Sequence, residues 1–592
     1  MRAKATQDGV TLRAIAGTHN VLLAMDLDPA VRPGCLGLSI ERTDLDSGER
    51  RWLPNMIRFA SDTSNGWLTT ARAPLQAFRW GDYTTTPGHR YRYRAVARRG
   101  TPAEIVQEGQ AAEAPGGADG LRGGVSVEVK AEDTGSPKTS VFFNRGAAAS
   151  KAYNDKFGNA DPDKSAAALV WLSRGLEEAL LAFLAQAKDA HWALHAVVYE
   201  FQKPNLLAAL AAAKARGADV QVVFHARCKQ PEHHAADHNE RRQHGAEDSD
   251  TAGSDHTLAK NLDAIRKAKL AKALGASLVR RDSNPQGAIM HDKYVVLLKD
   301  KAPVAVWTGS TNWTDGAIYG QLNVGHAIYE ARTAALYEES FRLLKGDPDA
   351  HDSKSGNAKI APAPKSRDAV RPGITPVFSP QANLDMIKLY AEICAKAKLL
   401  FVSAPFLLHS EIRDVLNSPS NGALRYVMAD KEGSFGPKGE IQLFNGDPGR
   451  VGAAATMLKS PLNDFQGKLL EGRESFHHAG VHVHTKIILA DPFGPDPILV
   501  TGSANFSNGS TTLNDSNSLI VRGDTAIADI YATEFMRMFQ HYWFRYRQGQ
   551  TPASGSSAAP PTVLTLKDSD EWQTSFFDGT STNSRDRVAF IA

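Results

Sequence analysis

The amino-acid sequence predicts an α/β protein with two repeated halves, preceded by a small all-β sandwich. Short β-rich runs separated by turn-rich stretches fill residues 1–134, as in a sandwich of antiparallel strands. After residue 165 the pattern changes to helices alternating with strands, which is typical of α/β sheets. The same order of elements returns about two hundred residues later, so the second half repeats the first.

Composition places the chain among ordinary globular proteins. Its 592 residues are 42% hydrophobic and 22% charged, enough for three or four domains of ~150 residues each. The net charge of +3 suits an anionic substrate without requiring one. The cysteines, Cys35, Cys228 and Cys394, lie too far apart in the chain to indicate a disulfide framework or a paired-cysteine metal site.

No segment indicates insertion into a membrane. The first residues, MRAKATQDGVTLRAIAG, lack the apolar core of a signal peptide. No run approaches the ~20 apolar residues of a membrane helix. We therefore expect a cytoplasmic protein, or one exported without a cleaved signal peptide.

The all-β segment, residues 1–134, contains strand-like runs such as Val10–Ala16 and Tyr91–Val96. Its segment Pro87–Arg98 resembles the late strand of a fibronectin type III module, an immunoglobulin-like sandwich. Such a module more often positions a neighbouring domain or recruits a partner than it catalyses a reaction. We therefore expect it to be separable from the catalytic centre.

The first α/β half spans residues 139–350. A helical stretch from Ser165 leads into the largely apolar strand Trp192–Phe201, which is followed by the helix Asn205–Arg216 and the strand Val220–His225. This β–α–β order predicts a mostly parallel sheet with a right-handed crossover.

The second half spans residues 373–548 and repeats this order, with a helix at Leu384–Ala397 and a strand at Leu399–Phe406. Between the halves, residues 351–372 are rich in Pro, Lys, Ser and Asp, which predicts a linker. The C-terminal tail, residues 549–592, carries aromatic side chains that indicate docking: Trp572, Phe576 and Phe577.

Each half contains one copy of a His-x-Lys motif followed by a Gly-Ser turn. The copies read MHDKYVVLLKDKAPVAVWTGSTNWTDG and VHTKIILADPFGPDPILVTGSANFSNG. The interval from histidine to glycine is 18 residues in both (309 − 291 and 502 − 484). A single copy is usually without function, but two equally spaced copies indicate one shared site. The matched pairs are His291 and His484, Lys293 and Lys486, Gly309 and Gly502, Ser310 and Ser503, and Asn312 and Asn505.

These residue types suit the cleavage of a phosphodiester. On a strand, residues i and i+2 share a face, so each motif histidine projects beside its lysine. The lysines, serines and asparagines offer preorganised donors for the negative charge that spreads over the phosphorus oxygens during attack. One imidazole can attack phosphorus, and the other can protonate the leaving oxygen.

With HTKIILAD followed by TGSANFS, the chain resembles the phospholipase D superfamily, whose motif is His-x-Lys-x4-Asp followed by a Gly-Ser element. The resemblance implies two α/β/α sandwich domains related by a pseudo-twofold axis, one cleft shared by both motifs, and a two-step mechanism without metal or cofactor. It implies that His291 attacks phosphorus and His484 protonates the leaving oxygen. The implied catalytic residues are His291, Lys293, His484 and Lys486. The implied phosphate-binding and support residues are Ser310, Asn312, Ser503, Asn505 and Asp491.

The chain departs from the family pattern at two places. Leu298 stands in the first copy where Asp491 stands in the second. The acid that follows the Gly-Ser element in relatives, where it helps orient a motif histidine, is missing: the counterparts read Asn323-Val324-Gly325 and Asn517-Ser518-Leu519. The candidates to replace this acid are Asp515 and Glu330.

Histidines before each motif invite a metal site, but a solvated loop fits them better. The insert before the first motif mixes acids and bases without a fixed pattern, and its histidines are His233, His234, His238, His244 and His256. His482 shares the strand face of His484, and we interpret it as a pocket neighbour rather than a ligand. The aromatic residues near the Gly-Ser elements, expected mainly in the core, are Trp307, Trp313 and Phe506.

The sequence therefore predicts a phosphodiesterase that hydrolyses the headgroup phosphodiester of a phospholipid through a covalent phosphohistidine intermediate. The expected partners are a phospholipid or other phosphodiester substrate and a membrane surface, and the catalytic unit is expected to be monomeric. Two alternatives stay open. One is a metal-independent nuclease that uses the same site on nucleic acid, and the other is a catalytically weak protein that binds phosphodiesters or other anions.

Overall fold

The computed structural model describes the chain except for residues 56, 65, 106–123, 134–137, 147–150, 159–160, 227–253, 284–286, 436–443, 457–480 and 550–564. The described part contains two seven-stranded mixed sheets and, before them, two four-stranded antiparallel sheets. This confirms the predicted α/β class with a leading all-β module. No helix in the described ranges is long and apolar enough to cross a membrane.

The all-β module consists of two antiparallel sheets around an apolar core. Alternation along β10 places Tyr91 and Tyr93 inside and Arg90 and Arg92 outside. One sheet contains β1 (Arg2–Gln7), β2 (Val10–Ala16), β3 (Val21–Leu27) and β9 (Arg79–Asp82); the other contains β11 (Val125–Lys130), β10 (Arg90–Arg98), β4 (Gly37–Asp44) and β5 (Arg50–Trp52). The short pairs are β6 (Pro54–Asn55) with β8 (Leu68–Thr69), and β7 (Arg58–Phe59) with β26 (Thr565–Leu566).

In the sheet of the first half, the first motif lies at the start of the central strand β16, whose first residue is Lys293. In order across the sheet, the strands are β12 (Thr139–Phe143), β18 (Val324–Ile328), β17 (Ala302–Gly309), β16 (Lys293–Lys299), β13 (Trp192–Val198), β14 (Asp219–His225) and β15 (Leu278–Arg281). Only the pairs β13–β14 and β14–β15 are parallel. The expected mostly parallel sheet is therefore wrong, because the motif strand turns back through a hairpin. Asp300 and Lys301 take the positive φ angles of 50° and 68° that a tight hairpin turn requires.

The sheet of the second half has the same strand order. Its strands are β19 (Gly373–Ser379), β25 (Ser516–Arg522), β24 (Ile498–Gly502), β23 (Ile487–Ala490), β20 (Leu399–Ala404), β21 (Leu424–Lys431) and β22 (Arg450–Thr456). The second motif directly precedes the central strand β23. The two motifs thus occupy equivalent places in two equally ordered sheets.

Helices cover both faces of each sheet. The outer face of the first sheet packs against α3 (Ala166–Ser173), α4 (Leu176–Ala185), α5 (Pro204–Ala215), α7 (Ser254–Lys267) and α8 (Leu270–Leu274). The outer face of the second packs against α11 (Asp385–Lys396) and α12 (Ser410–Asn417). The inner faces share one core with α9 (Ala331–Lys345) and α16 (Thr525–Gly549). The shorter helices are α2 (Lys151–Phe157), α10 (Ala350–Ile360), α15 (Asn508–Thr512) and α17 (Thr582–Ile591).

The segment predicted as a linker, residues 351–372, contains most of helix α10. Asp349 caps this helix by accepting a hydrogen bond from the backbone N–H of Asp352, and Gly356 lies against Leu343 of α9. The polar composition reflects a surface helix whose buried residues, Ser353 and Asn357, are themselves polar, rather than an extended connection.

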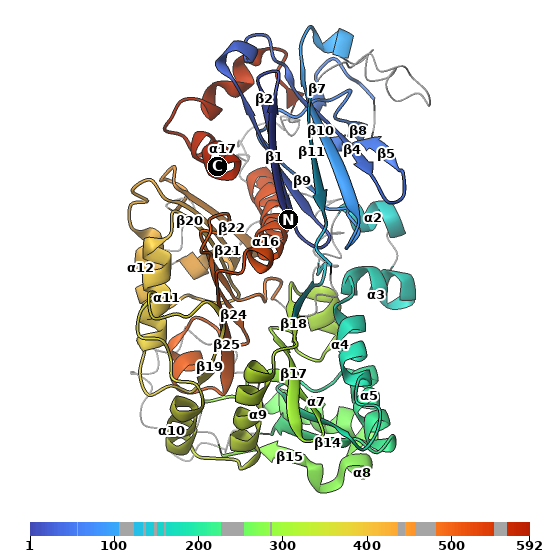
Figure 1. The fold of residues 1–592 in the computed structure, drawn as a ribbon, viewed down its shortest axis with the longest axis vertical. Helices are drawn as coiled ribbons and strands as arrows, with labels where there is room; N and C mark the ends of the chain where they lie inside the picture. Colours follow the sequence, from blue (N-terminus) through green and yellow to red (C-terminus); the bar gives the residue numbers. More distant parts are fainter. Residues whose placement is uncertain are drawn as a thin grey trace, which may run out of the picture.

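The all-β module shares a core with the second half. Ile15 and Leu22 belong to the same apolar cluster as Phe535 of α16. In Figure 1, α16 lies between the strands of the module and the sheet of the second half. The C-terminal tail adds further contacts, since Trp572 stacks on Phe78 of the module and Phe590 stacks on Phe401 of β20.

This shared core changes what removal of the module should do. We predict that a fragment beginning at residue 135 loses cooperative thermal unfolding and binds a dye that detects exposed apolar surface, because α16 and the tail lose their apolar cover. Differential scanning calorimetry compares the fragment with the whole chain. A fragment that unfolds cooperatively at the temperature of the whole chain would show that the module is separable, as the sequence alone suggested.

Candidate active site

Both motifs are buried and have the same internal geometry. The Lys293 ammonium donates a hydrogen bond to the backbone carbonyl of His291 at 2.5 Å, and the Lys486 ammonium donates to that of His484 at 2.8 Å. Both lysine side chains lie where solvent hardly reaches. Each motif therefore presents a fixed positive charge next to its histidine.

Backbone hydrogen bonds between the halves bring the two motifs together. The N–H of His291 donates to the carbonyl of Asp515 at 2.7 Å, and the N–H of His484 donates to the carbonyl of Leu322 at 3.2 Å. In return, the N–H of Asp515 donates to Ile289 and that of Leu322 donates to His482. Each motif is thus held by a loop of the other half.

His291 lies beside groups of the second motif. Burial lowers the pKa of His291 well below 6.5, and the charges of Lys293 and Lys486 lower it further. A hydrogen bond with the backbone of Ser503 raises the pKa of His291 and partly opposes these effects. His291 is therefore a neutral imidazole at neutral pH.

His484 is oriented by an asparagine of the first half. Its Nδ1 lies 2.9 Å from Oδ1 of Asn323. The amide nitrogen of Asn323 donates to the carbonyl of Ala317 at 2.9 Å, which fixes Oδ1 as the atom that faces His484. Nδ1 of His484 must then carry a proton, so Nε2 is the ring nitrogen that can exchange a proton with a substrate.

The serines of the Gly-Ser elements stabilise the turns that follow the strands. The hydroxyl of Ser310 donates to Oδ1 of Asn323 at 2.8 Å and accepts from the N–H of Val324 at 3.1 Å. The hydroxyl of Ser503 accepts from the N–H of Asn517 at 2.9 Å. In this arrangement both hydroxyl groups are engaged inside the protein.

The two asparagines of these elements are also buried. The side-chain nitrogen of Asn312 donates to the carboxylate of Glu200 at 2.5 Å. Glu200 follows β13, and no sequence motif pointed to it. The Glu200 carboxylate occupies one of the two N–H groups of the Asn312 amide. The second N–H group and the carbonyl oxygen of that amide are left for other partners.

Strand register shows that Asn323 and Asn517 are not counterparts, contrary to the sequence comparison. Gly309 pairs with Gly325, whereas Gly502 pairs with Ser518. The counterpart of Asn517 is therefore Val324, and the counterpart of Asn323 is Ser516. A sequence comparison without register places the two asparagines one residue out of step.

The two acids expected to replace the missing family acid have other partners. The carboxylate of Asp515 accepts hydrogen bonds from the buried Arg281 at 3.0 and 3.3 Å. The carboxylate of Glu330 accepts from the hydroxyl of Thr333 at 2.5 Å, at the start of α9. In the contacts of the described residues, it is Asn323 that orients a motif histidine.

Asp292, between the first motif histidine and lysine, was missed by sequence reasoning. Its carboxylate accepts a hydrogen bond from the amide of Asn517 at 2.6 Å, across the contact between the halves. Burial raises its pKa to about 7, opposed by hydrogen bonds from Asn517 and Ser503. Asp292 therefore couples the first motif to the Gly-Ser element of the second half.

A second pair of missed residues fixes the start of each motif. Nδ1 of His225 accepts from the N–H of Met290 at 3.3 Å, and the carboxylate of Asp430 accepts from the N–H of Val483 at 3.0 Å. His225 and Asp430 lie at the carboxyl ends of the equivalent strands β14 and β21. The only signal for this pair in the sequence was the equivalent position at the two strand ends, because one residue is a histidine and the other an aspartate.

Asp491 lies at the far end of β23 from His484. Its carboxylate accepts from the N–H groups of Lys398 and Leu399 at 2.8 and 3.1 Å, which fixes the start of β20. The aromatic residues near the Gly-Ser elements are core residues: Trp307 stacks with Phe142, Trp313 contacts Phe201, and Phe506 contacts Tyr390.

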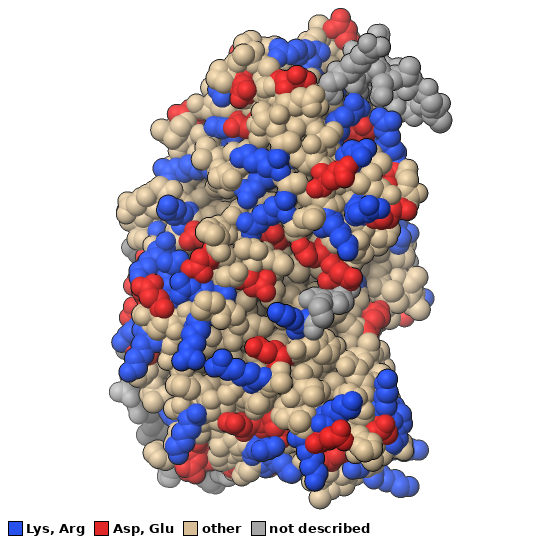
Figure 2. Space-filling view, viewed as in Figure 1, with Lys and Arg blue, Asp and Glu red and all other residues tan. Residues whose placement is uncertain are grey.

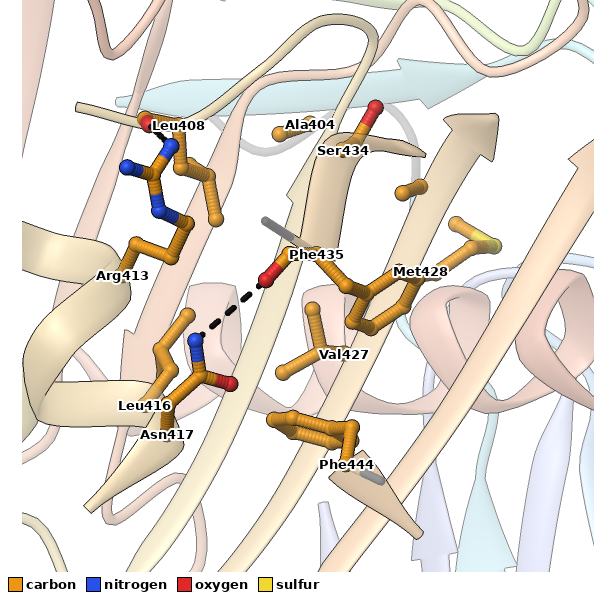
Figure 3. Close-up of a pocket in the computed structure, with 11 residues that line it drawn as sticks. Ala404, Leu408, Arg413, Leu416, Asn417, Val427, Met428, Ser434, Phe435 and Phe444 are labelled. Carbon is orange, nitrogen blue, oxygen red and sulfur yellow. Dashed lines mark hydrogen bonds between the residues drawn. The ribbon is translucent and has the colours of Figure 1, made fainter. Parts of the chain in front are cut away.

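The other features considered from sequence lie away from the motif residues. Of the histidines in the insert, only His256 is among the described residues, where it is exposed on α7. In the described ranges, the group with spacing suited to a metal ion is Asp44, Asp46 and His89 of the module. Figure 3 shows an apolar cavity lined by α12 and β21, with a volume of about 10 Å³, roughly the space of one water molecule.

Comparison with known proteins gives one family match. Residues 180–345 match the family model described as "Cardiolipin synthase, PLD-like domain", and no curated protein matches the chain. The phosphatidylserine synthase of Haemophilus influenzae is 12% identical, with 71% of this chain and 94% of that chain covered and a TM-score of 0.38. Nuc, a phospholipase D family member from Salmonella typhimurium, is 20% identical, with 34% and 91% covered and a TM-score of 0.19.

The polyphosphate kinase of Porphyromonas gingivalis is 11% identical, with a TM-score of 0.33. The match covers 58% of this chain and 42% of that chain, so this chain spans less than half the length of the kinase. At these identities and TM-scores, the three structures do not indicate which substrate this chain takes.

The raised pKa of Asp292 makes a prediction about stability. The folded state holds this carboxyl protonated up to about pH 7, whereas the unfolded chain ionises at the ordinary pKa of Asp. Stability therefore falls as the pH rises from that ordinary pKa to about pH 7, by up to ~1.4 kcal/mol per pH unit, and the loss then stays constant. Asp292→Asn keeps the acceptor for Asn517 and removes the charge. We expect this variant to be more stable than the parent at pH 8, with the difference shrinking toward pH 4.

Urea unfolding at pH 4, 6 and 8 measures this difference. Asp568→Asn, at an exposed position of the tail, serves as the matched control and should leave the unfolding free energy unchanged. Equal stability of Asp292→Asn and the parent at all three pH values would contradict a raised pKa.

Proposed function

We propose that the chain is a member of the phospholipase D superfamily that hydrolyses the headgroup phosphodiester of a phospholipid, on the premise that residues 180–345 match a phospholipase D-like family model. The observation that carries the proposal is the reciprocal contact between the motifs, in which the His291 N–H binds Asp515 and the His484 N–H binds Leu322. A phosphodiester placed between them would meet two lysines and two histidines at once.

In the first step of the proposed reaction, an imidazole nitrogen of His291 attacks phosphorus. The bond from phosphorus to the alcohol oxygen breaks. His484 enters this step as an imidazolium, and its Nε2 proton passes to that oxygen while Nδ1–H stays bound to Asn323. The low pKa of His291 supports this assignment, because a nucleophile must be unprotonated. Lys293 and Lys486 offset the charge that develops on the phosphorus oxygens.

In the second step, water attacks phosphorus and gives its proton to His484. The phosphorus–nitrogen bond breaks, and its electron pair returns to His291. The hydrogen bond between Asn323 and Nδ1 of His484 supports the role of His484, since it keeps the same ring orientation for both proton transfers.

Charge favours a lipid over a nucleic acid as the substrate. The net charge is only +3. On the face shown in Figure 2, Lys and Arg are interspersed with Asp and Glu rather than gathered into one basic surface. Binding along a nucleic acid backbone usually relies on such a surface.

A substrate panel without added metal tests the proposal. The protein is incubated with phosphatidylcholine, phosphatidylglycerol and single-stranded DNA. Release of phosphatidic acid from a lipid supports the proposal. Cleavage of DNA alone would indicate the nuclease alternative, and binding without turnover of any of the three would indicate a phosphodiester-binding protein.

We predict that exhaustive treatment with EDTA leaves turnover unchanged. Lys293 and Lys486 are held next to the histidines, where they supply the positive charge that a metal ion would otherwise provide. Rates are measured on a soluble nitrophenyl phosphodiester before and after treatment. Loss of activity that zinc or magnesium restores would contradict this prediction.

We predict that His291→Ala and His484→Ala each lower cleavage by orders of magnitude, since each removes one chemical role. With a nitrophenolate leaving group, which needs little protonation, His484→Ala should release one product and keep an acid-labile phosphoryl group on His291. His291→Ala should release none.

Mass spectrometry of digests prepared without acid locates the adduct. His351→Ala, at an exposed position on α10, is the control and should keep the parent rate. An adduct on His484 would reverse the two roles, and no adduct on either histidine would exclude the covalent mechanism.

A further inference from the structure

A cluster of basic side chains lies where the all-β module, the first half and α16 meet. His19 and Asn20 come from the turn between β2 and β3, Arg145 follows β12, and Arg174 lies between α3 and α4. Helix α16 contributes an acid and a third arginine. We call this group the junction cluster, and it consists of His19, Asn20, Arg145, Arg174, Glu534 and Arg537.

The junction cluster holds three guanidinium groups and one carboxylate. Glu534 is buried and pairs with Arg174 at 2.9 Å and with Arg537 at 2.8 Å. Arg145 instead stacks on Trp171, with its Cζ 4.2 Å from the ring centroid. Among the described residues, the Arg145 side chain has no carboxylate partner, so the positive charge in the cluster exceeds the negative.

The groups of the cluster act on each other electrostatically. Burial lowers the pKa of Arg145 to about 9, and the charges of Arg174 and Arg537 contribute to this shift. Burial likewise lowers the pKa of Arg174 to about 10, and that of His19 to about 3. At neutral pH the arginines stay charged and His19 is neutral.

Several donors in the cluster are buried without an acceptor in the described part of the chain. They are Nε of Arg145, Nε of Arg174 and Nδ2 of Asn20. The Arg174 side chain is 2% exposed and Asn20 is 0% exposed. Ordered water could satisfy these donors, but it cannot offset the excess of positive charge, and uncompensated buried charge is costly.

We propose that the junction cluster binds a phosphate-type oxyanion. Arg145, Arg537 and His19 are only half-buried, so an anion can reach them from solvent while Arg174 and Asn20 line the inner side. Guanidinium groups match a tetrahedral oxyanion because their N–H groups donate in parallel pairs. This site contains none of the motif residues, so it does not depend on the proposed catalytic function.

Inorganic phosphate, with chloride at equal ionic strength as the reference, tests the proposal. The whole chain is titrated in thermal-unfolding and calorimetric experiments. Arg145→Gln removes a guanidinium that forms no hydrogen bond with the described residues and should weaken phosphate binding about tenfold or more. Arg145→Lys keeps the charge and loses the paired donors, so it should bind with intermediate affinity.

Two control variants separate phosphate binding at the junction cluster from a general effect of net charge and from binding at the motifs. Lys272→Gln, on the exposed side of α8, changes the net charge equally and should keep the full response to phosphate. Lys293→Gln weakens any phosphate binding at the candidate active site and should also keep the response of the junction cluster.

A response equal to that in chloride would overturn the proposal. A response that survives in Arg145→Gln but disappears in Lys293→Gln would also overturn it, by assigning phosphate to the candidate active site alone. Neither result depends on whether the protein cleaves a lipid.

Vesicles distinguish free phosphate from a lipid headgroup as the source of the oxyanion. Sedimentation with phosphatidylcholine vesicles that contain phosphatidic acid is compared between the parent and Arg145→Gln. A loss of vesicle binding in the variant supports a headgroup at the junction cluster. Equal sedimentation, together with a phosphate response that needs Arg145, supports the free ion.

Discussion

The site depends on two backbone contacts between the halves, one from Met290 to Asp515 and the other from Leu322 to Val483. Each contact is an isolated pair of hydrogen bonds outside any sheet. In each contact, the backbone N–H of a motif histidine is one of the donors. Buried backbone donors must find acceptors, and these donors find them only in the opposite half. Docking of the halves and assembly of the site are therefore one event.

The same backbone scheme carries different side chains in the two halves, and this makes the histidines unequal. His225 and Asp430 accept equivalent N–H groups, but only one of them is a carboxylate. Between histidine and lysine, the first motif has the buried acid Asp292, whereas the second has Thr485, which exchanges a hydrogen bond with Ser403. Equal geometry with unequal electrostatics allows two imidazoles to take different chemical roles.

The sequence predicted the class of the fold and the motif residues because both depend on local patterns. Alternation in β10 and the 18-residue interval in both motifs can be read within short segments. The sense of the strands could not be read in this way. The parallel return from β13 to β14 was expected and is present, but the antiparallel strands around the first motif were not expected. The hairpin at Asp300 and Lys301 depends on two positive φ angles that their residue types do not require.

Residues that act across the two halves were harder to predict. Asn323 and Asn517 looked equivalent, and only the register with Gly309 and Gly502 separates them. Asp292 occupies the unspecified position of the His-x-Lys motif and was not singled out, because its partner Asn517 lies 225 residues away. Such contacts follow from how the halves dock, and one sequence contains no local signal for that.

The all-β module is connected to the site through α16 rather than standing beside it. Arg537 of α16 donates to the carbonyl of Asn144 at 3.0 Å, and Oδ1 of Asn144 accepts from the N–H of Asn323 at 2.9 Å. Asn323 in turn binds Nδ1 of His484. A short series of hydrogen bonds thus joins the junction cluster to a motif histidine. Helix α16, which also carries the apolar contacts of the module, therefore takes part in the hydrogen bonds that position Asn323 beside His484.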